Sequence, residues 1–157
     1  MSDAPPKILE TPEGAFACEA VRRATILARQ IQKEMVTPAL TKGDRSPVTV
    51  ADFAVQAVVS KLLSDALPND TLVGEESAGE LQKPEQAESL EQVTQFVQSV
   101  FPKSTSQAVC DWIDRGAAEP TSRFWTLDPI NGTKGFLRGG HYAVALVLNA
   151  DGRVPLD

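Results

Sequence analysis

Apolar residues recur every three or four positions near the start of the chain, which is the spacing of one face of an α-helix. The first stripe predicts a helix over 13–34, built on Phe16, Ala20, Ala24, Leu27, Ile31 and Met35. Thr37-Pro38 ends this helix, because proline disfavours helical geometry in the residue before it. The second stripe predicts a helix over 52–67, built on Val55, Val58, Val59, Leu62, Leu63, Ala66 and Leu67.

The pattern between and after these helices predicts short strands and turns. Residues 46–50, Ser-Pro-Val-Thr-Val, follow a Lys-Gly-Asp turn signal and predict a hairpin or an extended loop. Residues 71–74 predict a short strand that leads into Glu75 and Glu76, and the polar residues 77–87 predict a mobile loop.

Two further helices and three strands complete the pattern. Helices are predicted around 90–100 and 105–117, and strands at 124–127, at 141–148 and after the Asp151-Gly152 turn signal. The order of elements predicts an α+β or layered α/β domain without internal repeats.

Composition limits the functional classes. The chain has 157 residues, 42% of them hydrophobic, which is enough for the core of one soluble domain, and its net charge of -6 argues against nucleic acid or an anionic membrane as the main partner. No apolar run approaches the roughly 18 residues that span a bilayer. Residues 1–12 are proline-rich without a signal-peptide core, and we expect a flexible lead-in.

The two cysteines, Cys18 and Cys110, lie far apart in the sequence, and each falls in an apolar helical pattern. This arrangement favours reduced thiols in the core over a disulfide, and therefore a cytoplasmic protein.

Carboxylates stand at the edges of three predicted elements: Asp52 at a helix start, Glu75-Glu76 after one strand and Asp128 after another. Such edges commonly present catalytic groups, and Mg²⁺ prefers oxygen ligands together with substrate phosphate. If the three places converge, they indicate metal-assisted phosphate chemistry.

Each place also has a simpler interpretation. Asp52 would serve as a helix cap, with Thr49 as the other candidate. Glu75 and Glu76 would be a solvated pair, and Asp128-Pro-Ile-Asn-Gly an ordinary turn. Spacing alone leaves both interpretations open.

Three ordered motifs resemble those of one family. Gly74-Glu75-Glu76-Ser77 and Asp128-Pro129-Ile130-Asn131-Gly132-Thr133 resemble the GEES and D-P-I/L-D-G-T signatures of the inositol monophosphatase superfamily. The continuation 134–139, Lys-Gly-Phe-Leu-Arg-Gly, and the upstream segment 42–52 are similar to the 3'(2'),5'-bisphosphate nucleotidases, which are lithium-sensitive and magnesium-dependent. The resemblance runs from about residue 16 to the end. It implies an N-terminal α+β domain over 13–157, with a helix pair packed on a mostly antiparallel sheet.

The resemblance also implies roles for individual residues. Glu75 and Asp128, the backbone carbonyl of Ile130 and the side chain at position 131 would bind two or three Mg²⁺ ions. Asp52 would accept a hydrogen bond from the Thr133 hydroxyl, and the two would together orient and deprotonate the attacking water. Glu76 would hold the metal ligands in place.

The implied substrate is 3'-phosphoadenosine 5'-phosphate, and its sulfated relative, with loss of the 3'-phosphate in sulfur metabolism. Lys134 and Arg138 would contact this anionic substrate, or they are simply solvated charges. The single histidine, His141, has no role in this chemistry.

Two departures from the family pattern change what we expect. Asn131 replaces the second aspartate of the motif and brings no negative charge, which predicts weakened metal binding and low activity. The sequence stops at Asp157, whereas the family continues into a region with a W-D-x-A-A/G motif. We therefore expect a fragment or truncated gene product, with a partner chain as one source of the missing region. The alternatives are a non-catalytic metal- or nucleotide-binding derivative, or an inositol polyphosphate phosphatase, which Lys134-Gly135-Phe136 disfavours.

Overall fold

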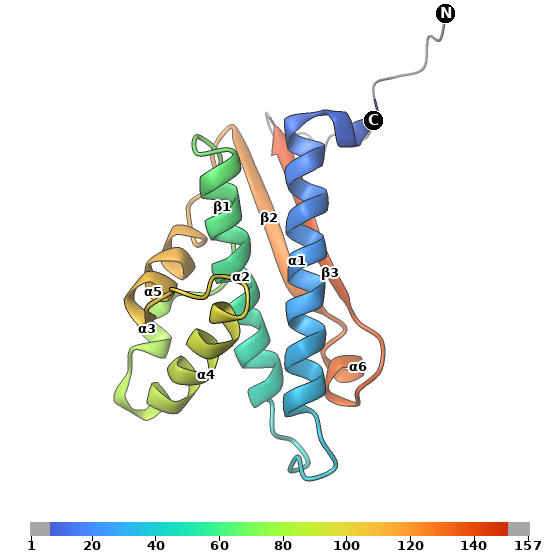
Figure 1. Cartoon of the computed structure of the whole chain (residues 1–157), viewed down its shortest axis with the longest axis vertical. Coiled ribbons are helices and arrows are strands. Elements are labelled where there is room, and N and C mark those ends of the chain that lie inside the picture. The colour runs from blue at the N-terminus through green and yellow to red at the C-terminus, as the bar shows by residue number, and fades with distance from the viewer. Residues whose placement is uncertain (1–6, 151–157) are drawn as a thin grey trace, which may run out of the picture.

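The computed structural model describes residues 7–150 as helices packed with a small three-stranded sheet (Figure 1), which confirms the predicted α+β class. The helices are α1 (Pro12–Met35), α2 (Ser46–Ala66), α3 (Ala78–Leu81), α4 (Ala87–Gln98), α5 (Ser106–Arg115) and α6 (Thr133–Leu137), with 3-10 turns η1 (Ile8–Glu10) and η2 (Pro84–Gln86). The strands are β1 (Thr71–Val73), β2 (Arg123–Asn131) and β3 (Ala143–Ala150). The turn and last strand predicted at and after Asp151 lie outside the described residues.

Helix α2 forms the centre of the core. It packs against α1, α4, α5 and β2, and nearly every side chain from Val50 to Ser60 is buried. By length and composition alone α2 could cross a membrane, contrary to the expectation that no run in the sequence comes close. However, 72% of its most apolar window is buried inside the protein, as expected for a core helix.

The start of α2 corrects the sequence prediction. The helix begins at Ser46 rather than at Asp52, because Pro47 suits the first turn of a helix, where its missing N–H would have no partner. The Asp44 carboxylate accepts hydrogen bonds from the Ser46 backbone N–H at 2.9 Å and from its hydroxyl at 2.6 Å. Asp52 therefore lies in the second turn and does not cap the helix.

The N-terminal segment is also more structured than expected over the residues that the structure describes. Thr11 caps α1 by accepting a hydrogen bond from the Gly14 N–H at 2.9 Å, and Pro12 is the first helical residue. Residues 8–10 form η1, whose Ile8 carbonyl lies so close to Gly14 that a Cβ there would overlap it. Residues 7–12 are thus a capped helix start and not an extended tail.

The sheet has the strand order β1-β2-β3 and is mixed. Strand β1 runs parallel to β2, with Leu72 opposite Trp125, and β3 runs antiparallel to β2, with Leu148 opposite the same tryptophan. The segment 77–87, predicted as a mobile loop, contains α3 and η2, because Ala78 and Leu81 are buried.

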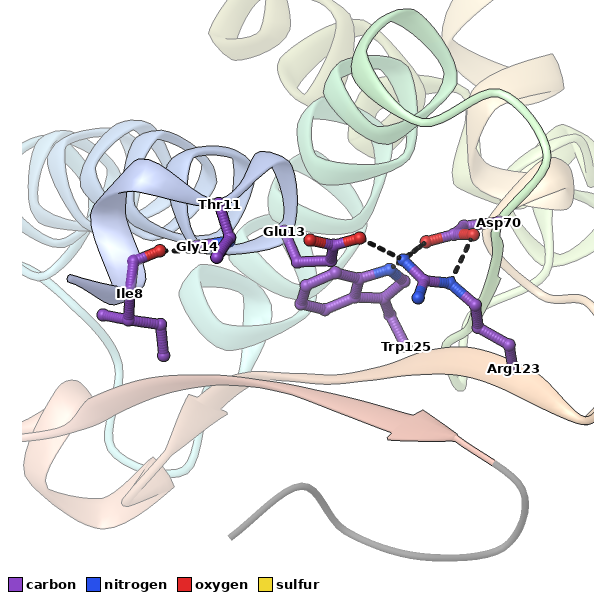
Figure 2. Close-up of polar contacts among 7 residues, drawn as sticks. All are labelled: Ile8, Thr11, Glu13, Gly14, Asp70, Arg123 and Trp125. Carbon is purple, nitrogen blue, oxygen red and sulfur yellow. Dashed lines mark hydrogen bonds and ion pairs between the residues drawn. The ribbon is translucent and has the colours of Figure 1, made fainter. Parts of the chain in front are cut away.

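A polar cluster ties the start of α1 to the sheet (Figure 2). The Arg123 guanidinium on β2 donates to both Asp70 carboxylate oxygens, at 2.8 and 3.0 Å, and to Glu13 of α1 at 3.1 Å. The indole N–H of Trp125 donates to Asp70 at 3.0 Å. Asp70 stands in the turn before β1, so this cluster joins three separate parts of the chain.

Both cysteines are free. Cys110 is buried as predicted, but Cys18 is exposed. Cys18 lies on the side of α1 opposite the stripe of Phe16 and Ala20, and the prediction of a core thiol was wrong at this position.

Candidate functional site

Carboxylates from three distant parts of the sequence lie close enough for their charges to act on Asp52. This half-buried side chain has its pKa raised to about 7, first because burial disfavours its charge, then because the charges of Glu76, Asp128 and Glu75 are close. The charge of Arg45 acts in the opposite direction but does not cancel them. The sequence-predicted acidic positions are therefore brought together.

The four carboxylates differ in exposure. Glu76 is half-buried, and its pKa is raised by burial and by the neighbouring charge of Glu75. Glu75 and Asp128 are exposed to solvent. The cluster thus contains two exposed and two half-buried carboxylates.

A buried glutamine holds the Glu75-Glu76 segment. Gln56 lies one helical turn after Asp52, and its amide group donates to the Glu76 carbonyl at 2.8 Å and accepts from the Glu76 N–H at 3.1 Å. The same amide donates to the carbonyl of Ile113 at 2.8 Å. Sequence reasoning missed Gln56, although a polar residue within an apolar helical stretch was a usable signal.

Glycine is required where β1 leads into this segment. The Gly74 N–H donates to the carbonyl of Gly116 at 2.6 Å, so the two backbones are in close contact. A Cβ on Gly74 would overlap the Gln56 amide and lie 2.6 Å from the Gly116 carbonyl oxygen. The absence of a side chain at residue 74 therefore gives the Gln56 amide room to reach Glu76.

A β-bulge in β2 sets the positions of Asp128 and Asn131. The pairing with β3 shifts between these two residues, and the strand continues to Asn131 rather than ending at Asp128 as predicted. Regular alternation would place residues three apart on opposite faces of the sheet. The bulge buries both Pro129 and Ile130 and leaves Asp128 and Asn131 exposed.

Helix α6 begins directly after the bulge. Gly132 has a φ of 103°, in the left-handed region that favours glycine, and its carbonyl accepts the Phe136 N–H at 3.0 Å. From α1, the Gln32 side chain donates to the carbonyls of Phe136 and Gly140, each at 3.1 Å. Buried Phe136 stacks edge-on against Tyr142 with ring centroids 4.9 Å apart. These contacts fix the start of α6, where Thr133 lies half-buried.

The expected hydrogen bond from the Thr133 hydroxyl to Asp52 is not formed in the part of the chain that the structure describes. The pKa of Asp52 reflects burial and neighbouring charges only, without a hydrogen-bond donor. The pairing of these two side chains remains a prediction from the resemblance.

The donor chemistry of the cluster fits a hard divalent cation. Its side chains offer only oxygen atoms, and the pKa of Asp52 is raised first by burial and then by the negative charges of its carboxylate neighbours. Within residues 7–150, however, no three acidic, histidine or cysteine side chains are arranged as a metal site. In the predicted ligand set only Glu75 and Asp128 are carboxylates, because the Ile130 carbonyl and the Asn131 amide carry no charge.

A basic pocket of about 310 Å³ lies between the α1–α2 connection and α6. It is lined by Thr37, Leu40, Thr41, Lys42, Gly43, Asp44, Lys134, Leu137 and Arg138. Among the described ion pairs none involves its three cationic side chains, and Asp44 is hydrogen-bonded to Ser46. The pocket therefore carries a net positive charge, and one of its cations, Lys134, directly follows Thr133 in the sequence.

Comparison with known proteins gives consistent matches. A model of the inositol monophosphatase family matches residues 11–156. The chain is 39% identical to a 3'(2'),5'-bisphosphate nucleotidase of Schizosaccharomyces pombe, over 90% of this chain and 44% of that protein. It is 42% identical to 3'(2'),5'-bisphosphate nucleotidase 2 of Candida albicans and to a probable 3'(2'),5'-bisphosphate nucleotidase 3 of Arabidopsis thaliana, covering 87% and 89% of this chain. It spans only 42% and 43% of those two proteins.

Proposed function

Because this chain belongs to the inositol monophosphatase family, we propose that it carries the cation- and phosphate-binding part of a 3'(2'),5'-bisphosphate nucleotidase-type phosphomonoesterase. The observation that carries this proposal is the convergence of Asp52, Glu75, Glu76 and Asp128. The similarity of the matched relatives supports it.

Each residue of the cluster has a proposed role. Glu75, Asp128, the Ile130 carbonyl and the Asn131 amide oxygen would hold Mg²⁺, which when bound neutralises phosphate charge and makes water more acidic. Asp52, with a pKa of about 7, is suited to accept the proton of the attacking water near neutral pH. Thr133 would orient that water, and Glu76 would keep the ligands in place.

The proposed substrate is 3'-phosphoadenosine 5'-phosphate or its sulfated relative, with release of the 3'-phosphate. Lys134 and Arg138, together with Lys42, would hold a second anionic group of this substrate in the basic pocket. A place in sulfur metabolism and a cytoplasmic location remain predictions of the same proposal.

Phosphate release tests the proposal. We would assay the chain with phosphoadenosine phosphate and with inositol phosphates, with and without Mg²⁺ and lithium, beside Asn131→Asp. Magnesium-dependent and lithium-sensitive release from the nucleotide alone supports the proposal. Release from inositol polyphosphates instead would favour the alternative phosphatase, and no release from either variant would contradict catalysis by this chain.

A second candidate function is a non-catalytic binder of metal and nucleotide, or a subunit that works with a partner chain. The observation that favours it is Asn131, which removes one negative charge from the proposed ligand set. Thermal stabilisation by Mg²⁺ plus nucleotide without turnover would support this function, because ligands that bind only the native state raise its stability.

A further inference from the structure

Gln56 is the most completely buried polar side chain near the acidic cluster. None of its surface is exposed, and it lies between the buried residues Val55 and Ala57 on α2. A buried amide without partners destabilises a fold, so an apolar side chain would ordinarily occupy such a position. Here both amide hydrogens and the amide oxygen have partners, at 2.8, 2.8 and 3.1 Å.

The backbone around Gln56 leaves room for it. Gly74 has no side chain where a Cβ would overlap the Gln56 amide, and a Cβ on Gly116 would lie 3.1 Å from the Gln56 Cγ. Two glycines on different segments thus border one glutamine. This arrangement holds the amide group in one position against the Glu76 backbone.

We propose that Gln56 is a positioning residue that fixes the Glu75-Glu76 backbone relative to Asp52 and thereby sets the cation affinity of the acidic cluster. Asp52 and Gln56 are four residues apart, so they lie on neighbouring turns of one side of α2. Because one amide binds both the N–H and the C=O of Glu76, the segment is restrained against sliding and against rotation. This inference rests on the proposed function, in which the cluster holds a divalent cation.

Neighbouring positions of α2 supply matched controls. Ser60 is buried one turn further along, and its hydroxyl has no hydrogen-bond partner among the residues described. Val59 is 1% exposed and contributes only apolar packing. Ser60→Ala removes a buried hydroxyl that has no hydrogen-bond partner among the residues described, and Val59→Ala lowers stability by removing buried apolar packing.

The experiment measures Mg²⁺ affinity by calorimetry for the chain, Gln56→Met, Val59→Ala and Ser60→Ala, well below each melting temperature. It also measures hydrogen exchange of the Glu76 amide in metal-free protein. We expect Gln56→Met to weaken Mg²⁺ binding at least tenfold and to speed Glu76 exchange at least tenfold. Val59→Ala and Ser60→Ala should bind Mg²⁺ within about twofold of the unchanged chain.

Unchanged Mg²⁺ affinity in Gln56→Met, or an equal loss in the destabilised Val59→Ala, would overturn the inference. If the unchanged chain binds no Mg²⁺, the proposed function fails instead, and Glu76 exchange alone decides whether Gln56 fixes the segment. If Gln56→Met does not fold, Gln56→Asn replaces it. Its amide is one methylene shorter and cannot keep all three hydrogen bonds, so the same loss is expected and unchanged affinity again contradicts the inference.

Discussion

Two aspartates, Asp70 and Asp52, have pKa values that this fold shifts in opposite directions. Burial pushes the pKa of Asp70 upward, but the hydrogen bonds from Arg123 and Trp125 and the charge of Arg123 outweigh it, so its pKa lies below the usual value (Figure 2). Burial pushes the pKa of Asp52 in the same direction, but its neighbours are other carboxylates and the pKa reaches about 7. Burial is common to both, and the partners determine the result.

The difference separates structure from proposed function. The Asp70 carboxylate is neutralised by Arg123 and joins the turn before β1 to β2. The Asp52 carboxylate is left among like charges, which destabilises the metal-free fold and favours binding of a cation. A carboxylate whose charge the fold leaves uncompensated is therefore the better indicator of a site.

The largest expected effect comes from removing the Asp70 carboxylate, which Arg123 neutralises. Asp70→Ala leaves the Trp125 N–H and the Arg123 guanidinium without their shared partner, and we expect the free energy of unfolding to fall by about 3 kcal/mol at pH 7. Chemical denaturation measures this change. Asp65→Ala, which breaks the exposed helical pair with Lys61, is the control and should cost about 0.4 kcal/mol. An equal effect of the two substitutions would contradict the structural role of Asp70.

Asp52→Asn should raise the free energy of unfolding, whereas Asp70→Ala lowers it. The folded pKa of about 7 lies above the unfolded value, so ionising Asp52 costs stability that grows as the pH rises towards 7 and is absent near pH 4. In chelator at pH 8 we expect the variant to be more stable by about 2 kcal/mol, a value reduced for partial exposure to solvent. Denaturation at pH 4 and pH 8 tests this, and a gain that does not depend on pH would contradict it.

Asn131→Asp sharpens the same contrast by adding a carboxylate to the proposed ligand set. The new charge should strengthen Mg²⁺ binding about tenfold, or about 1.4 kcal/mol, because a divalent cation gains a charged ligand. Calorimetry measures the affinity, and Asn149→Asp on β3 is a control for added charge elsewhere. An equal gain in the control would show that the effect is not local.

The smallest effect is expected for Glu76→Gln. The pKa of Glu76 is raised by burial and by Glu75, so removing its charge should stabilise the metal-free protein at pH 8, but less than Asp52→Asn does. Thermal unfolding in chelator ranks the two variants. A loss of stability would mean that Glu76 is neutralised by a partner, as Asp70 is.

Much of the fold was predictable because apolar periodicity reflects burial directly. The helix built on the stripe that begins at Phe16 is identified from apolar spacing, and the short strand at 71–74 from the helix break that precedes it. The start of α2 was not, because Pro47 resembles a helix breaker unless its place in the first turn is known. The 77–87 segment was misjudged because only Ala78 and Leu81 are buried in an otherwise polar run.

The site was predictable in its residues but not in its geometry. Motif resemblance identified the acidic positions, and their proximity then follows from the structure. The bulge that leaves Asp128 and Asn131 exposed arises from pairing with β3, which lies more than ten residues away in the sequence. Gln56 was missed because its three hydrogen bonds go to two distant residues, Glu76 and Ile113, which the sequence around residue 56 does not indicate.

The contact of Gly74 and Gly116 with Gln56 has a consequence for how this chain tolerates mutation over time. Alanine at residue 74 would overlap the Gln56 amide and lie 2.6 Å from the Gly116 carbonyl oxygen, so it requires both a smaller residue 56 and a shift of the Gly116 backbone. A smaller residue 56 in turn leaves the Glu76 backbone unpaired, which favours restoring the glutamine. Substitutions at residues 56, 74 and 116 are therefore expected to be inherited together or not at all, because each of these residues limits what the other two can be.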